Sequence, residues 1–245
     1  MRANLIASVR DLRILLNSIN VLVSEARLHF TDNGLNVRAV DYANVAMVAA
    51  SIRSDVFESY SIAEKFKTGI DVVRLSDFCK SLESKAKAEL TVMDRKLILT
   101  SGNVTYTIAL IDPEAIRKEP NVPQLSLSAE VVMDAKEFKK AISTVEMIDD
   151  DEVVFEKTDA EFRIAGEGNV ERISCIFGKS KLIKANDGKA KARYSLEYLK
   201  SFCKIAGDAE ILRIRFDNDY ICWLKFEIKD GFEIDYILAP RRDRE

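Results

Sequence analysis

Short patterns of glycine and lysine in the chain resemble nucleotide-binding motifs but do not complete them. The run Gly178-Lys179-Ser180 has the ending of a phosphate-binding loop, yet that loop needs another glycine five residues before Gly178, where the chain has Ile173. Gly166 and Gly168 lack the third glycine of a dinucleotide-binding turn. We therefore expect no nucleotide cofactor.

Acidic residues, histidine and cysteine give no clearer sign of catalysis. The acidic run Asp149–Glu152 offers oxygen ligands for a hard cation, but consecutive carboxylates in a loop are more often solvated charge. His29 is the only histidine and has no nucleophile pattern near it. The cysteines are scattered without a CxxC pair, which predicts reduced core thiols: Cys79, Cys175, Cys203 and Cys222. We expect no metal, no cofactor and no enzymatic activity.

Composition is that of an ordinary globular protein. The 245 residues are 47% hydrophobic and 31% charged, with nine Gly and four Pro, and they suffice for one large or two small domains. Thirty-seven basic and 40 acidic residues give a net charge of −3, which argues against simple coating of nucleic acid and leaves local basic patches open. No apolar run is long enough to span a membrane, so we expect an intracellular protein.

The prolines divide the chain. Three of the four lie between Pro113 and Pro123, which predicts a linker over residues 112–125 between an N-terminal domain, 1–111, and a C-terminal domain, 126–245. The same order of elements recurs on both sides of this linker. The fold class is therefore α+β, with two similar β-rich domains that each contain two helices.

Hydrophobic periodicity places the elements of both halves. The helices are expected at about Ser8–Leu22, Val72–Ser84, Ala135–Met147 and Leu196–Ala206. In the first half the strands are expected at Ala3–Ala7, Ala26–Thr31, Leu35–Val40, Val45–Arg53, Phe66–Ile70, Ala88–Met93, Lys96–Thr100 and Val104–Ile111. In the second half they are expected at Ser126–Met133, Glu152–Lys157, Glu161–Ala165, Val170–Phe177, Lys191–Tyr194, Ile211–Phe216, Ile221–Ile228 and Phe232–Leu238.

The polar faces of the four helices lean basic although the whole chain is acidic. On the first helix Leu12, Leu15 and Ile19 share an apolar stripe, while Arg10 and Arg13 lie on the opposite face. The other helices repeat this arrangement with lysines and one arginine. Such faces fit either ordinary solvated surfaces or a weak, sequence-independent attraction for phosphate.

Two segments resemble a known family. Asp32–Val48 closely resembles the signature of the sliding clamps of archaea and eukaryotes, the proliferating cell nuclear antigen (PCNA) family, and Tyr236–Arg241 is similar to its closing strand. With the linker and the duplicated halves, the resemblance covers essentially the whole chain. It implies the DNA clamp fold, in which three two-domain subunits close head to tail into a ring around duplex DNA.

The resemblance also implies which basic residues face the DNA. Arg13, Lys80 and Lys204 match basic residues that line the hole in the family. The helix faces and their neighbourhood add these candidates: Arg10, Arg74, Lys136, Lys139, Lys140 and Lys200. The chain departs from the family at Asn20, Asp77 and Glu197, where Lys or Arg is frequent.

A second implied site is a hydrophobic pocket under the linker that accepts a short peptide with a glutamine and aromatic residues. Its candidate residues are Val40, Asn44, Val45, Met47, Val122, Pro123, Ile237, Leu238, Ala239 and Pro240. Ile221 stands where many members have a proline, which affects the shape of the pocket. The alternative for Val40, Val45 and Met47 is ordinary sheet core.

Subunit contacts in this family join edge strands, which removes an unpaired edge. The strands would be Val104–Ile111 on one side and about Asn169–Phe177 on the other. The candidate interface residues are Val104, Tyr106, Ile108, Leu110, Val170, Arg172 and Ser174.

The function implied by the resemblance is that of a DNA polymerase sliding clamp, with a heterotrimeric or checkpoint-type clamp subunit as the alternative. The implied partners are double-stranded DNA, identical or paralogous clamp subunits, a separate clamp loader, and DNA polymerase, flap nuclease and DNA ligase bound through peptide motifs. The short ending Arg241–Glu245 is more typical of archaea, which places the protein in the cytoplasm at the nucleoid; a eukaryotic protein would be nuclear.

Overall fold

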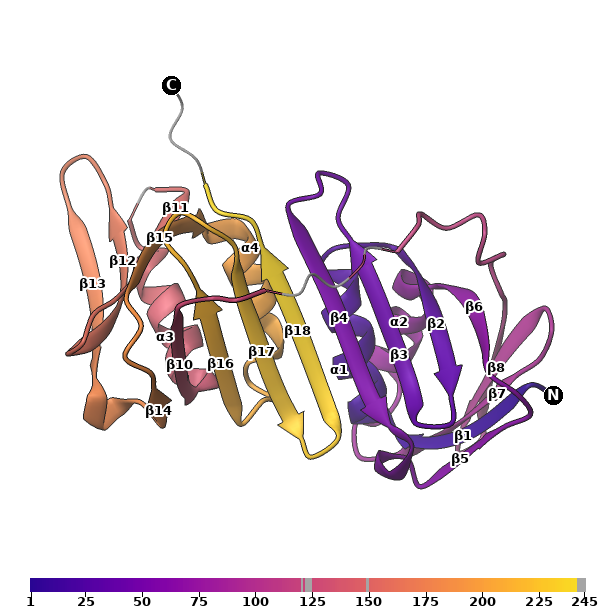
Figure 1. Ribbon diagram of the computed structural model, residues 1–245. Coiled ribbons are helices and arrows are strands. Elements are labelled where there is room, and N and C mark those ends of the chain that lie inside the picture. The colour runs from indigo at the N-terminus through magenta and orange to yellow at the C-terminus, as the bar shows by residue number, and fades with distance from the viewer. Residues whose placement is uncertain (120, 122–124, 149, 242–245) are drawn as a thin grey trace. The chain divides into compact units, whose positions relative to one another are not determined.

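The computed structural model describes residues 1–119, 121, 125–148 and 150–241 (Figure 1). Contacts within the chain divide it into two compact units. Unit 1 spans Met1–Asn121 and includes Lys229–Ile234, and unit 2 spans Val122–Ile228 and Asp235–Glu245. Both units are built from antiparallel strands and short helices, as the periodicity predicts.

The elements of unit 1, in chain order, are β1 (Ala3–Ser8), α1 (Val9–Asn20), β2 (Glu25–Thr31), β3 (Gly34–Val40), β4 (Ala46–Arg53), the 3-10 turn η1 (Ser54–Val56), β5 (Ser59–Ile62), β6 (Phe66–Asp71), α2 (Val72–Ser81), β7 (Lys87–Val92), β8 (Lys96–Ser101) and β9 (Val104–Ala109). The strands pair in the orders β5-β1-β7-β8-β9 and β4-β3-β2-β6. The strand β9 therefore lies at the edge of its sheet.

The elements of unit 2 are β10 (Ala129–Asp134), α3 (Ala135–Val145), β11 (Glu152–Lys157), β12 (Glu161–Glu167), β13 (Arg172–Gly178), the 3-10 turn η2 (Lys179–Lys181), β14 (Lys184–Ala185), β15 (Ala190–Ser195), α4 (Leu196–Phe202), the 3-10 turn η3 (Cys203–Ile205), β16 (Ile211–Phe216), β17 (Cys222–Lys229) and β18 (Phe232–Leu238). Lys229, the last residue of β17, and Phe232–Ile234, the first residues of β18, group with unit 1. The strand orders are β13-β12-β11-β15 and β14-β10-β16-β17-β18, so β13 is an edge strand.

Three of the helices begin at a capping side chain. The hydroxyl of Ser8 accepts a hydrogen bond from the backbone N–H of Asp11 at 3.0 Å, and the carboxylate of Asp71 accepts one from Arg74 at 2.9 Å. Asp134 caps α3 in the same way. These side chains satisfy backbone donors that have no partner inside the helix, so the boundaries follow from local sequence.

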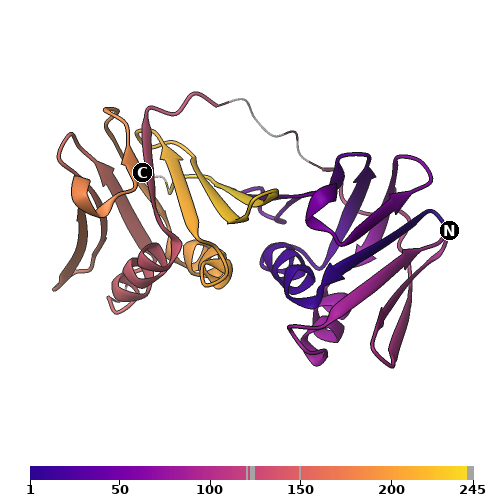
Figure 2. The ribbon, with the colours of Figure 1, turned by 90° about the horizontal axis from the view of Figure 1, so that it is seen from below.

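In each unit the helices lie beside each other and cover one face of the strands (Figure 2). Their apolar stripes are buried, as on α1, where Leu12, Leu15 and Ile19 are at most 3% exposed. In unit 2 the ring of Phe155 contacts those of Phe162 and other aromatic residues at centroid distances of 5.1–6.0 Å. The helices therefore turn their polar faces away from the core.

The ends of several elements differ from the sequence expectation. The second helix stops at Ser81 rather than Ser84, and the fourth stops at Phe202 and continues as the 3-10 turn η3. The strand expected from Val170 begins at Arg172, which leaves Val170 96% exposed before it. Terminal turns fray and tighten according to their tertiary partners, which periodicity does not record.

The short strands β5 and β14 were not predicted. Each pairs with the outer edge of a longer strand, β5 with β1 and β14 with β10. The two residues of β14 are too few to show an alternating pattern, and the four of β5 alternate only over a short run. Both strands pair with an available edge of a longer strand.

The chain after β9 returns to the edge of β6. Ile111 forms an isolated bridge with Gly69 rather than extending β9 as expected. A Cβ atom at Gly69 would lie 2.5 Å from the side chain of Ile116 and 2.7 Å from the carbonyl oxygen of Ile111. Glycine is therefore required where this segment crosses the strand.

Candidate nucleic-acid and peptide interfaces

The predicted DNA-contacting residues of unit 1 lie on α1 and α2. Arg10, Arg74 and Lys80 are exposed. Arg74 pairs with Asp71 at 3.3 Å, and Lys80 pairs with Asp77 at 2.9 Å. Because these carboxylates lie on the same face, they offset part of its positive charge.

Arg13 differs from its neighbours because its guanidinium is used inside the unit. Its Nε donates to the carbonyl oxygen of Cys79 at 2.8 Å, and its Nη2 donates to those of Lys80 and Leu82. The last carbonyl groups of a helix have no hydrogen-bond donor within that helix. Arg13, which lies on α1, supplies donors to carbonyl groups at the C-terminal end of α2. Helical spacing placed Arg13 on the polar face and gave no sign of this use.

Most of the predicted DNA-contacting lysines of unit 2 have no carboxylate partner among the described residues, unlike Arg74 and Lys80 of unit 1. Lys136, Lys139 and Lys140 on α3 are exposed, as is Lys204 in η3. Within the described residues none of these four forms an ion pair, whereas Lys200 on α4 pairs with Glu146. An unpaired exposed lysine can meet a phosphate without first losing a carboxylate partner.

The half of the predicted peptide pocket that lies in unit 1 is built on the turn between β3 and β4. Asp41 is buried, and its Oδ1 accepts hydrogen bonds from the N–H groups of Val45 at 2.8 Å and Ala46 at 2.9 Å. Asn44 sits at a φ of 57°, where asparagine is tolerated better than most residues. The turn thus presents Asn44 outward and leaves Val40 and Val45 half-buried, while Met47 is buried in the sheet.

The remaining predicted pocket residues lie in unit 2 or outside the described chain. At the end of β18, Ile237 and Leu238 are buried, while Ala239 and Pro240 are half-buried. Val122 and Pro123 lie outside the described residues. Met47, Ile237 and Leu238 are therefore buried in the single chain, and the half-buried residues are the more accessible candidates for contact with a peptide.

Basic side chains of β2 form hydrogen bonds with the start of the linker. Arg27, which is buried, donates to the carbonyl oxygens of Pro113 at 2.5 Å and Ile116 at 2.6 Å. His29 contacts the carboxylate of Glu119 at 2.5 Å. We refer to residues 113–119 as the strap. The sequence predicted a linker here and gave no sign that it would be bound along its length.

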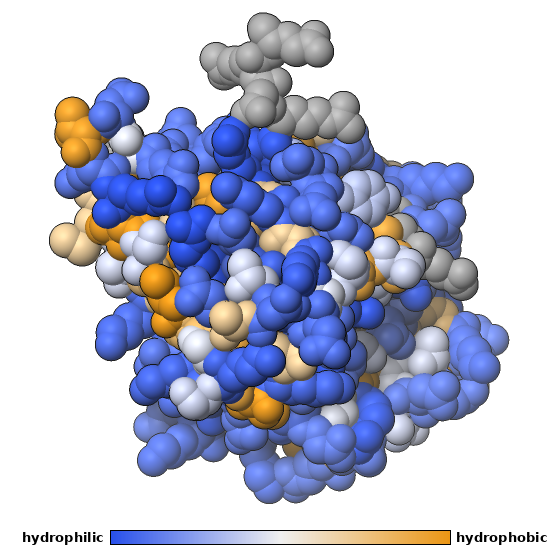
Figure 3. All heavy atoms as spheres, turned by 60° about the vertical axis from the view of Figure 1, so that its left-hand side comes forward, coloured by the Kyte–Doolittle hydropathy of each residue, from blue (hydrophilic) through white to orange (hydrophobic). Residues whose placement is uncertain are grey.

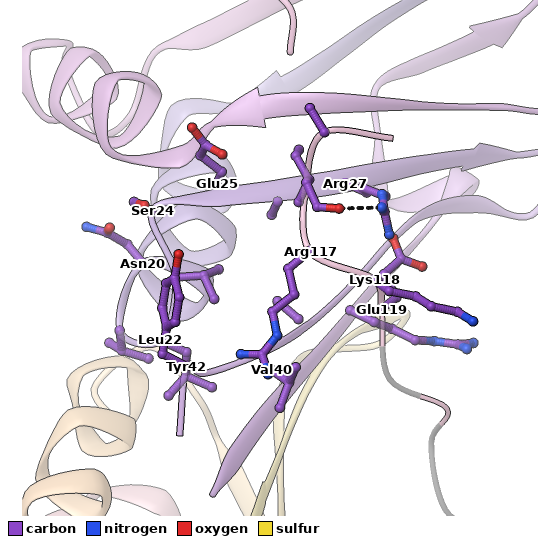
Figure 4. Close-up of a pocket in the computed structure, with 17 residues that line it drawn as sticks. Asn20, Leu22, Ser24, Glu25, Arg27, Val40, Tyr42, Arg117, Lys118 and Glu119 are labelled. Carbon is purple, nitrogen blue, oxygen red and sulfur yellow. Dashed lines mark hydrogen bonds between the residues drawn. The ribbon is translucent and has the colours of Figure 1, made fainter. Parts of the chain in front are cut away.

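A pocket of about 410 Å³ lies between the strap, the strands β2 and β3 and the loop after α1 (Figure 4). In Figure 4 the side chain of Arg117 reaches down from the strap toward Tyr42 and Val40. Its Nη1 donates to the carbonyl oxygen of Asp41 at 2.5 Å, and its Nη2 donates to Oδ1 of Asn44 at 2.7 Å. Arg117 therefore connects this pocket to the turn that carries the predicted peptide site, a connection that the sequence did not indicate.

The strands predicted to join subunits are both edge strands. On β9, Val104 is exposed, Tyr106 is half-buried against the ring of Phe78 at a centroid distance of 4.5 Å, and Ile108 is buried. Leu110 lies beyond the end of this strand.

On β13, Arg172, Ser174 and Ile176 alternate on the exposed side, and Ile176 is 56% exposed. Val170 lies before this strand rather than on it. Figure 3 shows this side of unit 2 as mostly hydrophilic with separate hydrophobic spots. The exposed apolar side chain of Ile176 was not among the predicted interface residues.

Among the residues that the structure describes, no cluster of three His, Cys, Asp or Glu side chains could hold a metal, and Asp149 of the acidic run lies outside them. Cys79, Cys175, Cys203 and Cys222 are free thiols, and burial raises the pKa of each. No helix in the described chain is long and apolar enough to span a membrane.

The chain matches known proteins over nearly its whole length. Residues 5–103 match the family model of the proliferating cell nuclear antigen, N-terminal domain, and residues 121–241 match that of the C-terminal domain. A DNA polymerase sliding clamp of Archaeoglobus fulgidus is 45% identical over 96% of both chains. One of Methanothrix thermoacetophila is 35% identical over 98% of both.

Solved structures agree with these relatives. The A. fulgidus PCNA in a complex with the C-terminal region of FEN-1 superimposes with a TM-score of 0.96 at 44% identity, covering 99% of this chain and 100% of that one. A PCNA from Thermococcus kodakaraensis, 23% identical, has the same fold with a TM-score of 0.89 over 98% of this chain and 100% of that one. From the family models and the archaeal relatives together, it follows that this chain belongs to the proliferating cell nuclear antigen family.

Proposed function

We propose that this chain is a DNA polymerase sliding clamp that encircles duplex DNA as a ring of three subunits and tethers replication and repair enzymes to it. The proposal rests on the 45% identity to an archaeal DNA polymerase sliding clamp over 96% of the chain. Tethering requires no catalytic step by the clamp itself. An archaeal clamp would act in the cytoplasm, at the nucleoid.

The distribution of charge supports a contact with DNA that is weak and independent of sequence. A clamp that slides needs diffuse attraction to phosphate and no hydrogen bonds to bases. The exposed lysines Lys136, Lys139, Lys140 and Lys204 have this character, because they are flexible and lack carboxylate partners within the described chain. Arg13 is assigned to the fold rather than to DNA, since its hydrogen bonds to α2 are already made.

The proposal is tested by retention on circular and linear DNA. The wild-type chain, loaded onto a nicked circle by an archaeal clamp loader, should stay bound after gel filtration and be lost when the circle is cut. The variant with Lys136→Glu, Lys140→Glu and Lys204→Glu should be retained several-fold less at 100 mM salt, because phosphate contacts become repulsive.

A matched control separates this effect from net charge. Lys181→Glu, Lys184→Glu and Lys191→Glu make the same change at exposed positions of unit 2 that lie on neither helix. The control should be retained like wild type. Equal loss in both variants would contradict the assignment of α3 and η3 to the DNA side, and retention on linear DNA would contradict encirclement.

The tethering half of the proposal rests on the turn between β3 and β4. Val45 is half-buried there and its backbone is held by Asp41. Val45→Glu should abolish binding of a peptide that carries a glutamine and two aromatic residues, because a charge would replace apolar contact surface. Unchanged affinity in a folded Val45→Glu protein would remove this turn from the peptide site.

A further inference from the structure

The pocket beneath the strap is lined by more cations than anions. Its charged residues are Arg27, Arg38, Arg117, Lys118, Glu25 and Glu119. Of the two carboxylates, Glu119 is already in contact with His29. This excess of positive charge stands out in a chain whose net charge is −3.

No ion pair involves the arginines or the lysine of this pocket among the described residues, although the pKa of the Glu114 carboxyl is lowered by its hydrogen bond with Lys67 and, to a smaller extent, by the charge of Arg27. Arg27 and Arg117 donate to neutral oxygens of the backbone and of Asn44, and Arg38 and Lys118 are exposed without an ion pair. Elsewhere the chain supplies carboxylate partners, as where Arg53 pairs with both Asp55 and Asp230 at 2.9 Å. The pocket therefore offers guanidinium and ammonium donors to an external anion.

The same pocket has an apolar side. Leu22, Val23 and Val40 are half-buried in its lining, and Tyr42 is 95% exposed with its ring 5.7 Å from the Arg117 guanidinium. A duplex backbone would not fill a concavity of about 410 Å³ with such walls. A peptide segment with acidic side chains suits these walls, because its methylene groups contact the apolar residues and its carboxylate oxygens meet the cations.

We propose that this pocket binds an acidic segment of partner peptides, adjacent to the residues that enter the peptide site at the turn between β3 and β4. The positive charge of the pocket favours an acidic occupant. The pocket is also continuous with the peptide site, which places the acidic segment next to the residues that enter that site. Val40 belongs to both sites, and Arg117 joins the strap to Asn44 of that turn. The inference rests on the proposed function, since it describes how the same partner peptides are chosen.

The test compares four synthetic peptides with one glutamine-and-aromatic motif. One has neutral serine flanks, one has two glutamates before the motif, one has two after it, and one has two lysines on each side. One of the two acidic peptides should bind the wild-type chain about tenfold more tightly than the neutral peptide at low salt, and the lysine peptide more weakly.

Two variants test whether the pocket causes the preference for glutamate-flanked peptides. Arg38→Glu with Lys118→Glu should erase the preference for glutamate and leave affinity for the neutral peptide unchanged. Lys85→Glu, an exposed charge reversal in the loop after α2, should keep the preference. Urea unfolding of each variant checks that the fold is intact.

The outcomes are distinguishable. Failure of the neutral peptide to bind would overturn the proposed tethering function. If the chain binds the neutral peptide and binds both acidic peptides with that same affinity, only the acidic-segment proposal is overturned. Loss of DNA retention in Arg38→Glu with Lys118→Glu, without any change in peptide preference, would also overturn it and assign these cations to nucleic acid.

Discussion

Arg13 shows that helical spacing does not reveal where a side chain makes its hydrogen bonds. The sequence predicts Arg13 on the polar face of α1, and its guanidinium donates to three carbonyl oxygens at and just beyond the end of α2. A planar group with several donors suits this task, and lysine does not reproduce it. We therefore expect Arg13 to stabilise unit 1.

Arg13→Ala should lower the free energy of unfolding of unit 1 by about 1–3 kcal/mol, since carbonyls at the end of α2 lose their donors. Arg13→Lys should restore little of it. Urea unfolding measures both. Arg74→Ala is the control, because that exposed pair with Asp71 is worth at most about 1 kcal/mol. Equal effects of Arg13→Ala and Arg74→Ala would contradict the structural role.

The buried thiols and tyrosines titrate far from their usual ranges. Burial raises the pKa of Cys79 to about 11, of Cys203 to about 12 and of Tyr60 to about 12. The pKa of the fully buried Cys222 thiol is also raised. These groups stay protonated and neutral in the folded chain, and the unfolded chain releases their protons at lower pH.

Stability should therefore fall in alkaline solution. A raised folded pKa gives a contribution that is fully present below the unfolded value near pH 9 and is lost as the pH rises toward 11 or 12. Each such thiol accounts for up to about 2 kcal/mol between pH 9 and 10.5. Urea midpoints should decline over this window, and Cys79→Ala should decline less steeply. An equal decline in both would contradict the assignment.

Lys157 changes the free energy of unfolding with pH in the direction opposite to that of the thiols. Burial lowers its pKa, and its ammonium donates to the carbonyl oxygen of Gly188 at 2.7 Å. A lowered folded pKa makes its contribution grow as the pH rises toward the unfolded value. The comparison between wild type and Cys79→Ala cancels this contribution, because both proteins contain Lys157.

At the scale of elements, β9 and β13 are the edge strands that are predicted to join subunits. Both end their sheets, so one side of each backbone has no strand partner within its sheet. The exposed face of β13 alternates Arg172, Ser174 and Ile176. An exposed isoleucine between polar residues on an edge strand is a natural contact point for a neighbouring subunit.

Ile176→Glu should convert the assembly to single chains, because a carboxylate would be buried without a partner in a strand-to-strand contact. Light scattering after size exclusion measures the change in mass. Ile183→Glu alters another exposed isoleucine, before β14, and should leave the assembly intact. An unchanged mass for Ile176→Glu would exclude this face of β13 from the subunit contact.

At the scale of the whole molecule, the proposed assembly is a ring of three identical or paralogous subunits, and a ring that forms from this chain alone is a homotrimer. The single chain has a mass of 27.7 kDa, so the purified protein should scatter as a particle of about 83 kDa over a range of concentrations. A mass near that of one chain would favour the heterotrimeric alternative, in which the edges need paralogous subunits. Mixing with candidate paralogues would then produce the ring.

Much of this molecule was predictable from local patterns. The starts of α1, α2 and α3 follow from the capping residues Ser8, Asp71 and Asp134, and the duplicated element order follows from internal repetition. The family resemblance of Asp32–Val48 predicted a function that the archaeal relatives share by name. These features are short-range, and the sequence records them directly.

Tertiary structure alone decided where long side chains make their hydrogen bonds. Arg13 reaches α2 about 66 positions along the chain, and Arg27 and Arg117 hold the strap across separations of 76–89 positions. An arginine can place its guanidinium on any surface within its reach, so helical or strand periodicity predicts the direction of its Cβ and not its partner. The sequence by itself thus determined the elements, their repetition and the family, while the folded chain decided which cations form hydrogen bonds within a unit and which lie exposed without an ion pair among the described residues.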